Sequence, residues 1–198
     1  MIGKTLIHTF KYFLGLENPS TQVSNDEQNM LSSLAKNAKK VLEIGVFEGH
    51  STKSLATSMS SGVLYAVDPF FTGSLGISYG LLITQQQIRQ ARRINHNVSI
   101  NLVRDFSYNL AKDKSITDFD LIFIDGDHSL EGIKQDYADW SDRVKKGGYL
   151  ALHDTKVPSH NPNVAKLGSF QYFESYIKFD SRFQLVDQID SLSILKRL

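Results

Sequence analysis

Two short polar segments carry side chains that could bind a cation. They are Asp125-Gly126-Asp127-His128 and His153-Asp154, and each follows an apolar run typical of a buried strand. Neighbouring strands lie about 5 Å apart, so on adjacent strands Asp125 and Asp154 would be close enough to share one cation. Carboxylate oxygens together with water favour Mg²⁺ or Mn²⁺. The alternative interpretation is that both acids are hydrogen-bonded loop residues.

A third segment, residues 43–51, reads EIGVFEGHS and also follows an apolar run. Gly45 and Gly49 would allow a tight turn and the close approach of a ligand to the backbone. Val46-Phe47 stands where the dinucleotide fingerprint G-x-G-x-x-G needs its second glycine, so a pyrophosphate would fit badly. The pattern suits an adenosine ligand without phosphates. Asp68, at the end of the next apolar run, could accept hydrogen bonds from both ribose hydroxyls.

Strands and helices that could position these segments alternate along the chain. The predicted strands cover residues 40–45, 63–67, 98–103, 120–124 and 149–152, with a terminal hairpin over 183–186 and 192–195. The predicted helices cover residues 24–37, 51–60, 81–95, 107–112, 129–143 and 169–177. We therefore expect a Rossmann-like, doubly wound α/β sheet of seven strands. It should be mostly parallel with a C-terminal antiparallel hairpin, carry helices on both faces, and bind ligands beyond the carboxyl ends of its strands.

The N-terminal region is expected to be an amphipathic helix followed by a linker, over residues 1–23, with one domain over residues 24–198. The apolar residues that recur at helical spacing are Leu6, Ile7, Phe10, Phe13 and Leu14. We expect this face to pack on the domain or on a second subunit, as in a homodimer. A helix on a membrane surface is the alternative. No apolar run approaches the length of about 20 residues that spans a membrane, so we expect no integral membrane segment.

The charge balance and the cysteine count of the chain exclude several classes of function. The chain has 198 residues, of which 41% are hydrophobic, and its 22 basic residues nearly balance its 21 acidic ones. This balance argues against nucleic acid as a partner. The chain has no cysteine, which excludes disulfides, cysteine zinc sites and thiol nucleophiles. It fits a reducing compartment, and we expect a cytoplasmic location.

Four segments together resemble a known family. They read VLEIGVFEGHST, YAVDPF, DLIFIDGDHSLEGIKQDYADW and KKGGYLALHDT, and the resemblance covers roughly residues 24–198. The sequence resembles the class I S-adenosylmethionine-dependent methyltransferases. More narrowly, it is similar to the metal-dependent, macrocin-type O-methyltransferases that act on sugars. The first motif is shared across class I enzymes, whereas IDGDH and HD are more specific to this subgroup.

The resemblance implies a binding site for S-adenosylmethionine. Residues 43–51 would line its methionine end, Asp68 would hold the ribose, and residues 105–107 would border the adenine. The residues expected around the cofactor are Glu43, Gly45, Phe47, Gly49, Ser51, Asp68, Asp105, Phe106, Ser107 and Asp125.

The resemblance also implies a metal site with Asp125, His153 and Asp154 as ligands of Mg²⁺ or Mn²⁺. Relatives commonly carry an acid at position 153, so His153 could instead lie outside the ligand set. His128 is the candidate general base, because related sugar methyltransferases place a histidine three residues after the first metal-binding Asp. An imidazole with a pKa near 6.5 could take the proton of a hydroxyl whose pKa a metal has lowered. The alternative for His128 is a polar residue at a helix N-terminus, and Asp127 is expected to be a loop acid.

The expected function is S-adenosylmethionine-dependent, metal-assisted O-methylation of a sugar or glycosylated small molecule. The expected partner is therefore a small-molecule or glycan hydroxyl acceptor. Two alternatives remain, a non-catalytic module that binds the cofactor and a polyamine synthase-like enzyme on the same fold. The segment over residues 70–80 contains the aromatic pair Phe70-Phe71 and three glycines, and it could be a mobile lid over the substrate.

Overall fold

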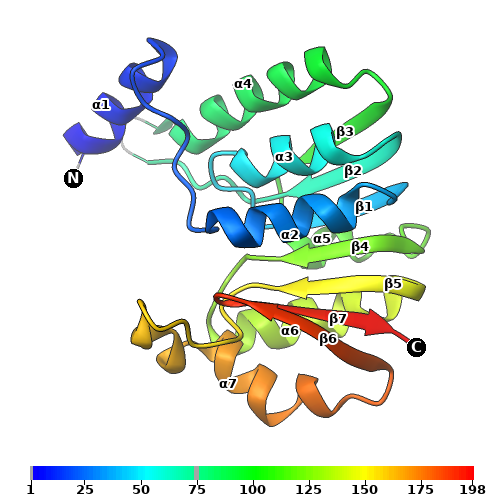
Figure 1. Cartoon of the computed structure of the whole chain (residues 1–198). Coiled ribbons are helices and arrows are strands. Elements are labelled where there is room, and N and C mark those ends of the chain that lie inside the picture. Colours follow the sequence, from blue (N-terminus) through cyan, green and yellow to red (C-terminus); the bar gives the residue numbers. More distant parts are fainter. Residues whose placement is uncertain (1, 74–75) are drawn as a thin grey trace.

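The computed structural model describes residues 2–73 and 76–198, and within them a single sheet of seven strands in the order β3-β2-β1-β4-β5-β7-β6 (Figure 1). The strands are β1 (Lys40–Ile44), β2 (Gly62–Val67), β3 (Val98–Val103), β4 (Phe119–Ile124), β5 (Val144–Leu152), β6 (Phe183–Ile189) and β7 (Leu192–Arg197). Neighbours among β1 to β5 pair in parallel, and β7 pairs antiparallel with both β5 and β6. The predicted sheet, including its C-terminal hairpin, is confirmed.

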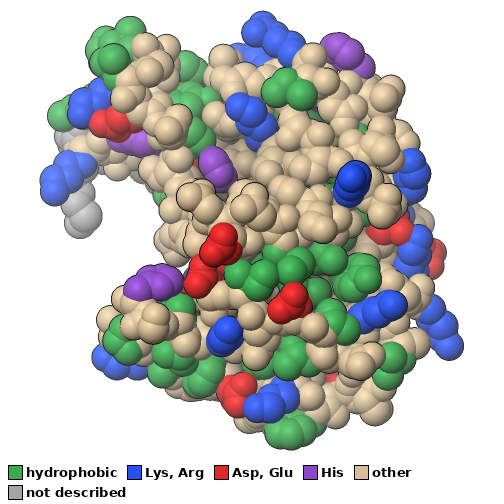
Figure 2. Space-filling model, in the orientation of Figure 1, with side chains coloured by type: hydrophobic (Ala, Val, Ile, Leu, Met, Phe, Trp, Pro, Cys, Tyr) green, Lys and Arg blue, Asp and Glu red, His purple; other side chains and the backbone are tan. Residues whose placement is uncertain are grey.

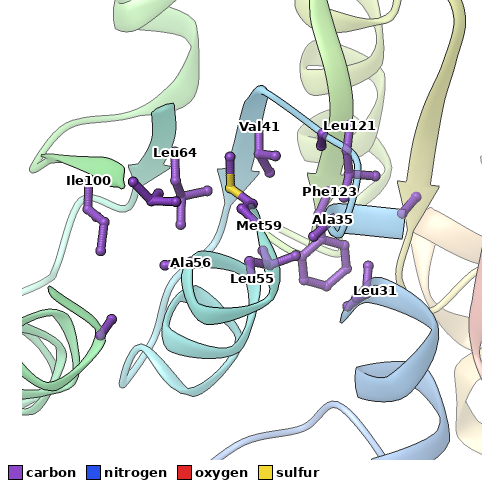
Figure 3. Close-up of a cluster of buried hydrophobic side chains, with 14 of the residues drawn as sticks. Leu31, Ala35, Val41, Leu55, Ala56, Met59, Leu64, Ile100, Leu121 and Phe123 are labelled. Atoms are coloured by element: carbon purple, nitrogen blue, oxygen red, sulfur yellow. The ribbon is translucent and has the colours of Figure 1, made fainter. Parts of the chain in front are cut away.

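Helices cover both faces of this sheet, as predicted. One face carries α2 (Asn25–Ala35), α3 (His50–Ser58) and α4 (Tyr79–Ile94), and the other carries α5 (Ser107–Leu110), α6 (Leu130–Trp140) and α7 (Gly168–Ser175). Figure 3 shows the first layer, where Leu31 of α2 and Leu55 of α3 lie against the sheet residues Val41 and Phe123. All four are fully buried, and burying one such side chain stabilises the fold by about 1.5–3 kcal/mol.

Local sequence signals explain where the helices begin. Ser24 caps α2, since its side chain accepts the N–H of Glu27 while the Glu27 side chain accepts the N–H of Ser24. Ser129 caps α6 by accepting the N–H of Gly132. Both caps satisfy backbone donors that have no partner within the helix.

The fifth strand differs from the prediction. It begins at Val144 instead of Tyr149, because Val144 already pairs with Phe119 of β4. The next pair is Leu121 with Tyr149, so the residues between form a bulge in which Gly147 has a φ of +78°. A positive φ at a glycine is common in such bulges, and the predicted turn at residues 146–148 is this bulge.

The N-terminal helix α1 (Ile2–Phe13) is confirmed, but the face expected to pack on the domain is exposed. The exposed fractions of Leu6, Ile7, Phe10, Phe13 and Leu14 run from 45% to 65%. The buried residues are Thr9 and Tyr12, and the Tyr12 hydroxyl accepts a hydrogen bond from Gln87 of α4. The prediction that the apolar face packs on the domain is therefore wrong, because the side of the helix that carries Thr9 and Tyr12 packs there instead. No helix within the described ranges is long and apolar enough to cross a membrane.

The carboxyl ends of the parallel strands lie at the edge of the sheet beside α1 (Figure 1). Figure 2 shows that the surface is hollowed at this edge, between α1 and the segment that precedes α7. The residues that follow the parallel strands therefore open into this hollow, where ligands of doubly wound sheets bind.

Candidate active site

Strand register brings the predicted segments together at this edge. Ile44 at the end of β1 lies opposite Val67 of β2 on one side and Ile124 of β4 on the other. Ile124 in turn lies opposite Leu152 of β5. The residues that follow these four strand ends are Gly45, Asp68, Asp125 and His153. Asp125 thus comes directly opposite His153, with Asp154 one position further along.

The loop of residues 45–49, called the glycine loop below, contains residues with a positive φ. Gly45 has a φ of +89°, and a Cβ there would lie 2.1 Å from the carbonyl oxygen of Asp125. The close approach at Gly45 is therefore to a neighbouring strand of the protein. Gly49 has a φ of +76° where α3 begins, and Phe47 has a φ of +55°. A non-glycine residue in the left-handed region stores strain, and such residues gather at functional sites.

Asp68 organises this loop. One carboxylate oxygen, Oδ2, accepts the N–H groups of Val46 and Phe47 at 2.9 and 3.0 Å, and Oδ1 accepts the N–H of Phe70 at 2.6 Å. A carboxylate offers about four acceptor positions. Asp68 therefore holds the loops after β1 and β2 together and retains acceptor capacity for a further donor.

Glu43 contributes a buried oxygen without a partner. Its Oε2 accepts the Thr52 hydroxyl, whereas Oε1 has no hydrogen-bond partner in the part of the chain that the structure describes. Burial raises the pKa of the Glu43 carboxyl to about 8. A buried carboxyl oxygen without a partner is unfavourable, so Oε1 would gain from a hydrogen bond with a ligand. Ser51, also expected here, is buried in the first turn of α3.

Of the residues predicted to border the adenine, Asp105 and Phe106 are exposed and Ser107 is half-buried. Asp105 is exposed, and hydrogen bonds from the Asn109 side chain and the Phe106 N–H lower its pKa. Ser107 instead donates to the buried Asp136, whose pKa burial raises to about 6. Asp136 was not anticipated, since it lies within a helix that the sequence assigns only to the core.

Phe106 lies in an exposed aromatic cluster. Its ring stacks on Tyr108 with centroids 5.1 Å apart and meets the edge of Phe71 at 5.9 Å. All three rings are at least 40% exposed. Of this cluster, the sequence indicated only Phe106 as a site residue, although the aromatic pair Phe70-Phe71 was visible. Phe70 is buried, and residues 74–75 of the expected lid lie outside the described residues.

The cation-binding candidates form one cluster. Nδ1 of His153 lies 2.8 Å from Oδ1 of Asp125 and 3.8 Å from Oδ1 of Asp154. The ring of His128 lies between the acids, with Nε2 3.7 Å from Asp125 Oδ1 and Nδ1 3.5 Å from Asp154 Oδ2. Asp125, His128 and His153 offer ligand atoms within 4.8 Å of one another. The structure thus brings together all four residues expected here.

These distances fit a shared divalent cation. Ligand atoms at about 2.1 Å from one Mg²⁺ are about 3 Å apart when adjacent and about 4 Å apart when opposite. The measured spacings run from 2.8 to 3.8 Å. Nδ1 of His153 is buried and makes no well-directed hydrogen bond to the residues described, even though Asp125 is close. A cation at this position would displace the proton from Nδ1 and take its lone pair, as metal ligands require.

The cluster includes a residue that the sequence assigned only to a helix cap. Nε2 of His153 lies 3.4 Å from Oε2 of Glu27, which is buried on α2. Burial alone would lower the pKa of His153, but Asp125, Glu27 and Asp154 together raise it. No local signal could have indicated Glu27, because the contact joins residues 126 positions apart.

A hollow of about 560 Å³ adjoins the cluster on the side of His128. Its lining residues are Gly126, Asp127, His128, Ser129, Leu130, Lys166, Leu167, Gly168 and Gln171. Asp127 accepts the N–H and the hydroxyl of Ser129 at 2.9 Å, as expected of a loop acid. The hollow is therefore a space beside His128 in which a second ligand could lie.

Comparison with known proteins agrees with this architecture. The family model described as a methyltransferase domain matches residues 42–155, more than half of the chain. A curated relative, an uncharacterized protein of Acanthamoeba polyphaga mimivirus, is 24% identical over 69% of this chain and 61% of its own length. The chain thus spans less than two thirds of that relative.

Two solved structures share the fold over nearly the whole chain. The O-methyltransferase from Bacillus cereus, in complex with SAH, has a TM-score of 0.65 at 18% identity and covers 98% of this chain and 90% of its own. The O-methyltransferase TomG from Streptomyces achromogenes, involved in tomaymycin synthesis and in complex with SAM, has a TM-score of 0.64 at 16% identity, with coverage of 98% and 89%. The chain therefore belongs to the methyltransferase domain family and has the Rossmann-like fold of its class I members.

Proposed function

We propose that the protein transfers a methyl group from S-adenosylmethionine to a hydroxyl of a sugar or glycosylated small molecule, assisted by Mg²⁺ or Mn²⁺. The observation that carries this proposal is the cluster of Asp125, His128, His153 and Asp154 beside the glycine loop. A loop that suits adenosine and a cluster that suits a cation lie at one edge of the sheet, in contact at Gly45 and Asp125.

Residues of the glycine loop and its neighbours would hold the cofactor. Asp68 would accept the ribose hydroxyls with its remaining acceptor positions, and the aromatic cluster of Phe71, Phe106 and Tyr108 would contact the adenine. The unpaired Oε1 of Glu43 would accept a donor from the methionine end, where an ammonium group is present. When bound, the cofactor supplies an activated methyl group on a positively charged sulfur.

The cluster of Asp125, His128, His153 and Asp154, called the acidic cluster below, would activate the acceptor hydroxyl. Asp125, His153 and Asp154 would bind the metal, which lowers the pKa of a nearby hydroxyl. His128, with 27% of its side chain exposed and beside the 560 Å³ hollow, would then take the hydroxyl proton on its imidazole. The chain's main contribution is to align the acceptor oxygen with the methyl group and to remove that proton.

Transfer of labelled methyl groups tests this proposal. We expect the purified protein to methylate at least one member of a panel of sugars and glycosylated small molecules when Mg²⁺ or Mn²⁺ is present. Chelation should abolish transfer, and Asp125→Asn should reduce it, whereas Asp139→Asn should not, because Asp139 is half-buried on α6 and its carboxylate bonds only to Gln135 among the described side chains. Tight binding of S-adenosylhomocysteine without any transfer would favour a non-catalytic binding module. Full activity in chelator would contradict the metal assignment.

We also propose that the exposed apolar face of α1 is covered by a second copy of the chain in a homodimer. Exposed contiguous apolar surface marks interaction sites. Light scattering of the purified protein should give twice the mass of one chain, and Phe10→Glu should give a monomer. A wild-type monomer at micromolar concentration would contradict this arrangement.

A further inference from the structure

Glu27 makes more contacts than a helix cap requires. As a capping residue, its Oε2 accepts the N–H of Ser24 at 2.8 Å. Its other oxygen, Oε1, accepts both the N–H and the hydroxyl of Ser191 at 2.8 Å, in the turn between β6 and β7. The capping box needs only the first of these bonds. The carboxylate is 1% exposed and is therefore fixed from two distant parts of the fold.

The fixed carboxylate faces one side of the His153 ring, and the acidic cluster faces the other. Nε2 lies 3.4 Å from Glu27 Oε2, while Nδ1 lies 2.8 Å from Asp125 Oδ1. An ionised carboxylate can only accept hydrogen bonds, so the ring nitrogen that faces Glu27 must carry a proton. By the same argument Nδ1, beside Asp125, carries a proton when no cation is bound. A cation shared with Asp125 and Asp154 would displace that proton and take the lone pair of Nδ1, while Nε2 keeps its proton beside Glu27.

We infer that Glu27 is a positioning residue for the metal site, which orients the His153 ring and keeps its proton on Nε2 so that Nδ1 faces the metal. The inference rests on the proposed metal-assisted function. Histidine ligands commonly donate their second ring N–H to a carboxylate, and loss of that partner typically weakens metal binding about 10–100-fold. Glu27 has no contact with the glycine loop among its described hydrogen bonds, so its effect should be confined to the metal.

Calorimetric titration of the full chain with Mn²⁺ tests this role directly. Glu27→Gln preserves size but replaces the carboxylate, and we expect it to weaken Mn²⁺ binding about 10–100-fold. Its affinity for S-adenosylhomocysteine should stay at the wild-type value. If this variant does not fold, Glu27→Asp keeps the charge but withdraws it from His153 by one methylene, and it should weaken Mn²⁺ binding in the same direction.

Ser24→Ala is the matched control. It removes the hydroxyl that caps α2 and bonds to Asp190, but it leaves the Glu27 carboxylate in place. We expect a lower unfolding temperature with unchanged Mn²⁺ affinity. Equal loss of Mn²⁺ affinity in Ser24→Ala and Glu27→Gln would overturn the inference, because the effect would then come from the helix cap.

The proton position gives a readout that does not depend on affinity. In the Mg²⁺-loaded wild type, nitrogen-15 NMR of the histidine rings should show the proton of His153 on Nε2, and Glu27→Gln should disturb this signal. If Glu27→Gln binds Mn²⁺ with the wild-type affinity, the role of Glu27 is overturned and the metal proposal still stands. A wild-type protein that binds S-adenosylhomocysteine but no Mn²⁺ would overturn the metal proposal together with this inference.

Discussion

The backbone of Gly45 lies so close to Asp125 that a Cβ at residue 45 would come within 2.1 Å of the Asp125 carbonyl oxygen. This contact joins the glycine loop after β1 to the acidic segment after β4. A change at Gly45 should therefore disturb both the proposed cofactor site and the proposed metal site.

Gly45→Ala should destabilise the fold and weaken both ligands. The positive φ costs about 1–2 kcal/mol for a residue with a Cβ, and overpacking adds about 1–3 kcal/mol. Gly147→Ala is the control, since Gly147 has a φ of +78° and no described atom within 4 Å of its Cβ position. Denaturant unfolding should show the larger loss in Gly45→Ala, and titration should show weaker binding of S-adenosylhomocysteine and Mn²⁺ in that variant only. Equal losses of stability in the two variants would assign the effect to φ alone.

Asp68→Ala should weaken cofactor binding through two losses. It removes the expected acceptor of the ribose hydroxyls and the acceptor of three backbone N–H groups. We expect the free energy of S-adenosylhomocysteine binding, measured by calorimetry, to weaken by about 1.5–3 kcal/mol, which is the range for hydrogen bonds to charged groups. Asp68→Asn, which keeps one oxygen, should show a smaller loss. An unchanged affinity in Asp68→Ala would remove this residue from the site.

Glu43 should release a proton when the cofactor binds. Because burial raises its pKa to about 8, the carboxyl is largely protonated at pH 7 in the free protein. A positively charged donor at Oε1 would favour the ionised form. Calorimetry at pH 7 in two buffers of different ionisation enthalpy should reveal this proton, and Glu43→Gln should not release it. Identical enthalpies in both buffers for the wild type would exclude the pairing.

Glu43 should also shape the dependence of stability on pH. The unfolded carboxyl ionises near pH 4.5, whereas the folded one ionises near pH 8. The folded state binds more protons between these values, so the contribution of Glu43 to stability is complete below pH 4.5 and is lost as the pH rises through 8. Glu43→Gln should remove this part of the slope in denaturant unfolding measured from pH 5 to pH 8. A slope identical to that of the wild type would contradict the raised pKa.

Asp154→Asn and His128→Ala should separate metal binding from proton removal. A neutral amide at residue 154 should weaken the metal, and higher metal concentration should partly restore the rate. His128→Ala should slow the chemical step about 10²–10⁴-fold, with a residual rate that rises with pH and no rescue by added metal. The methyl-transfer rates of both variants, measured across metal concentration and pH, distinguish a loss of metal binding from a loss of proton removal. Rescue of His128→Ala by metal alone would make His128 a ligand, since its Nε2 lies 3.7 Å from Asp125 Oδ1.

The secondary-structure elements, and the edge of the sheet at which the site lies, could be predicted from the amino-acid sequence. A strand such as β4, which reads FDLIFI, is short and almost wholly apolar, and this pattern predicts a parallel sheet covered on both faces. The Ser24 cap and the glycines at 45 and 49 are also local, because a cap and a positive φ depend on residues close in the chain. Asp68, Asp125 and His153 could be expected near one another because each follows a parallel strand.

Which side chains face one another across the site depends on how distant elements pack. The register of β4 and β5 places Asp125 opposite His153, and a one-residue slip would have placed it elsewhere. The contact between Glu27 and His153 depends on how α2 packs over the sheet, and no pattern in either segment encodes it. In α1 the apolar face lies at the surface, and Tyr12, which accepts a hydrogen bond from Gln87, is buried instead. Periodicity fixes which residues share a face, whereas packing between distant elements decides what that face meets.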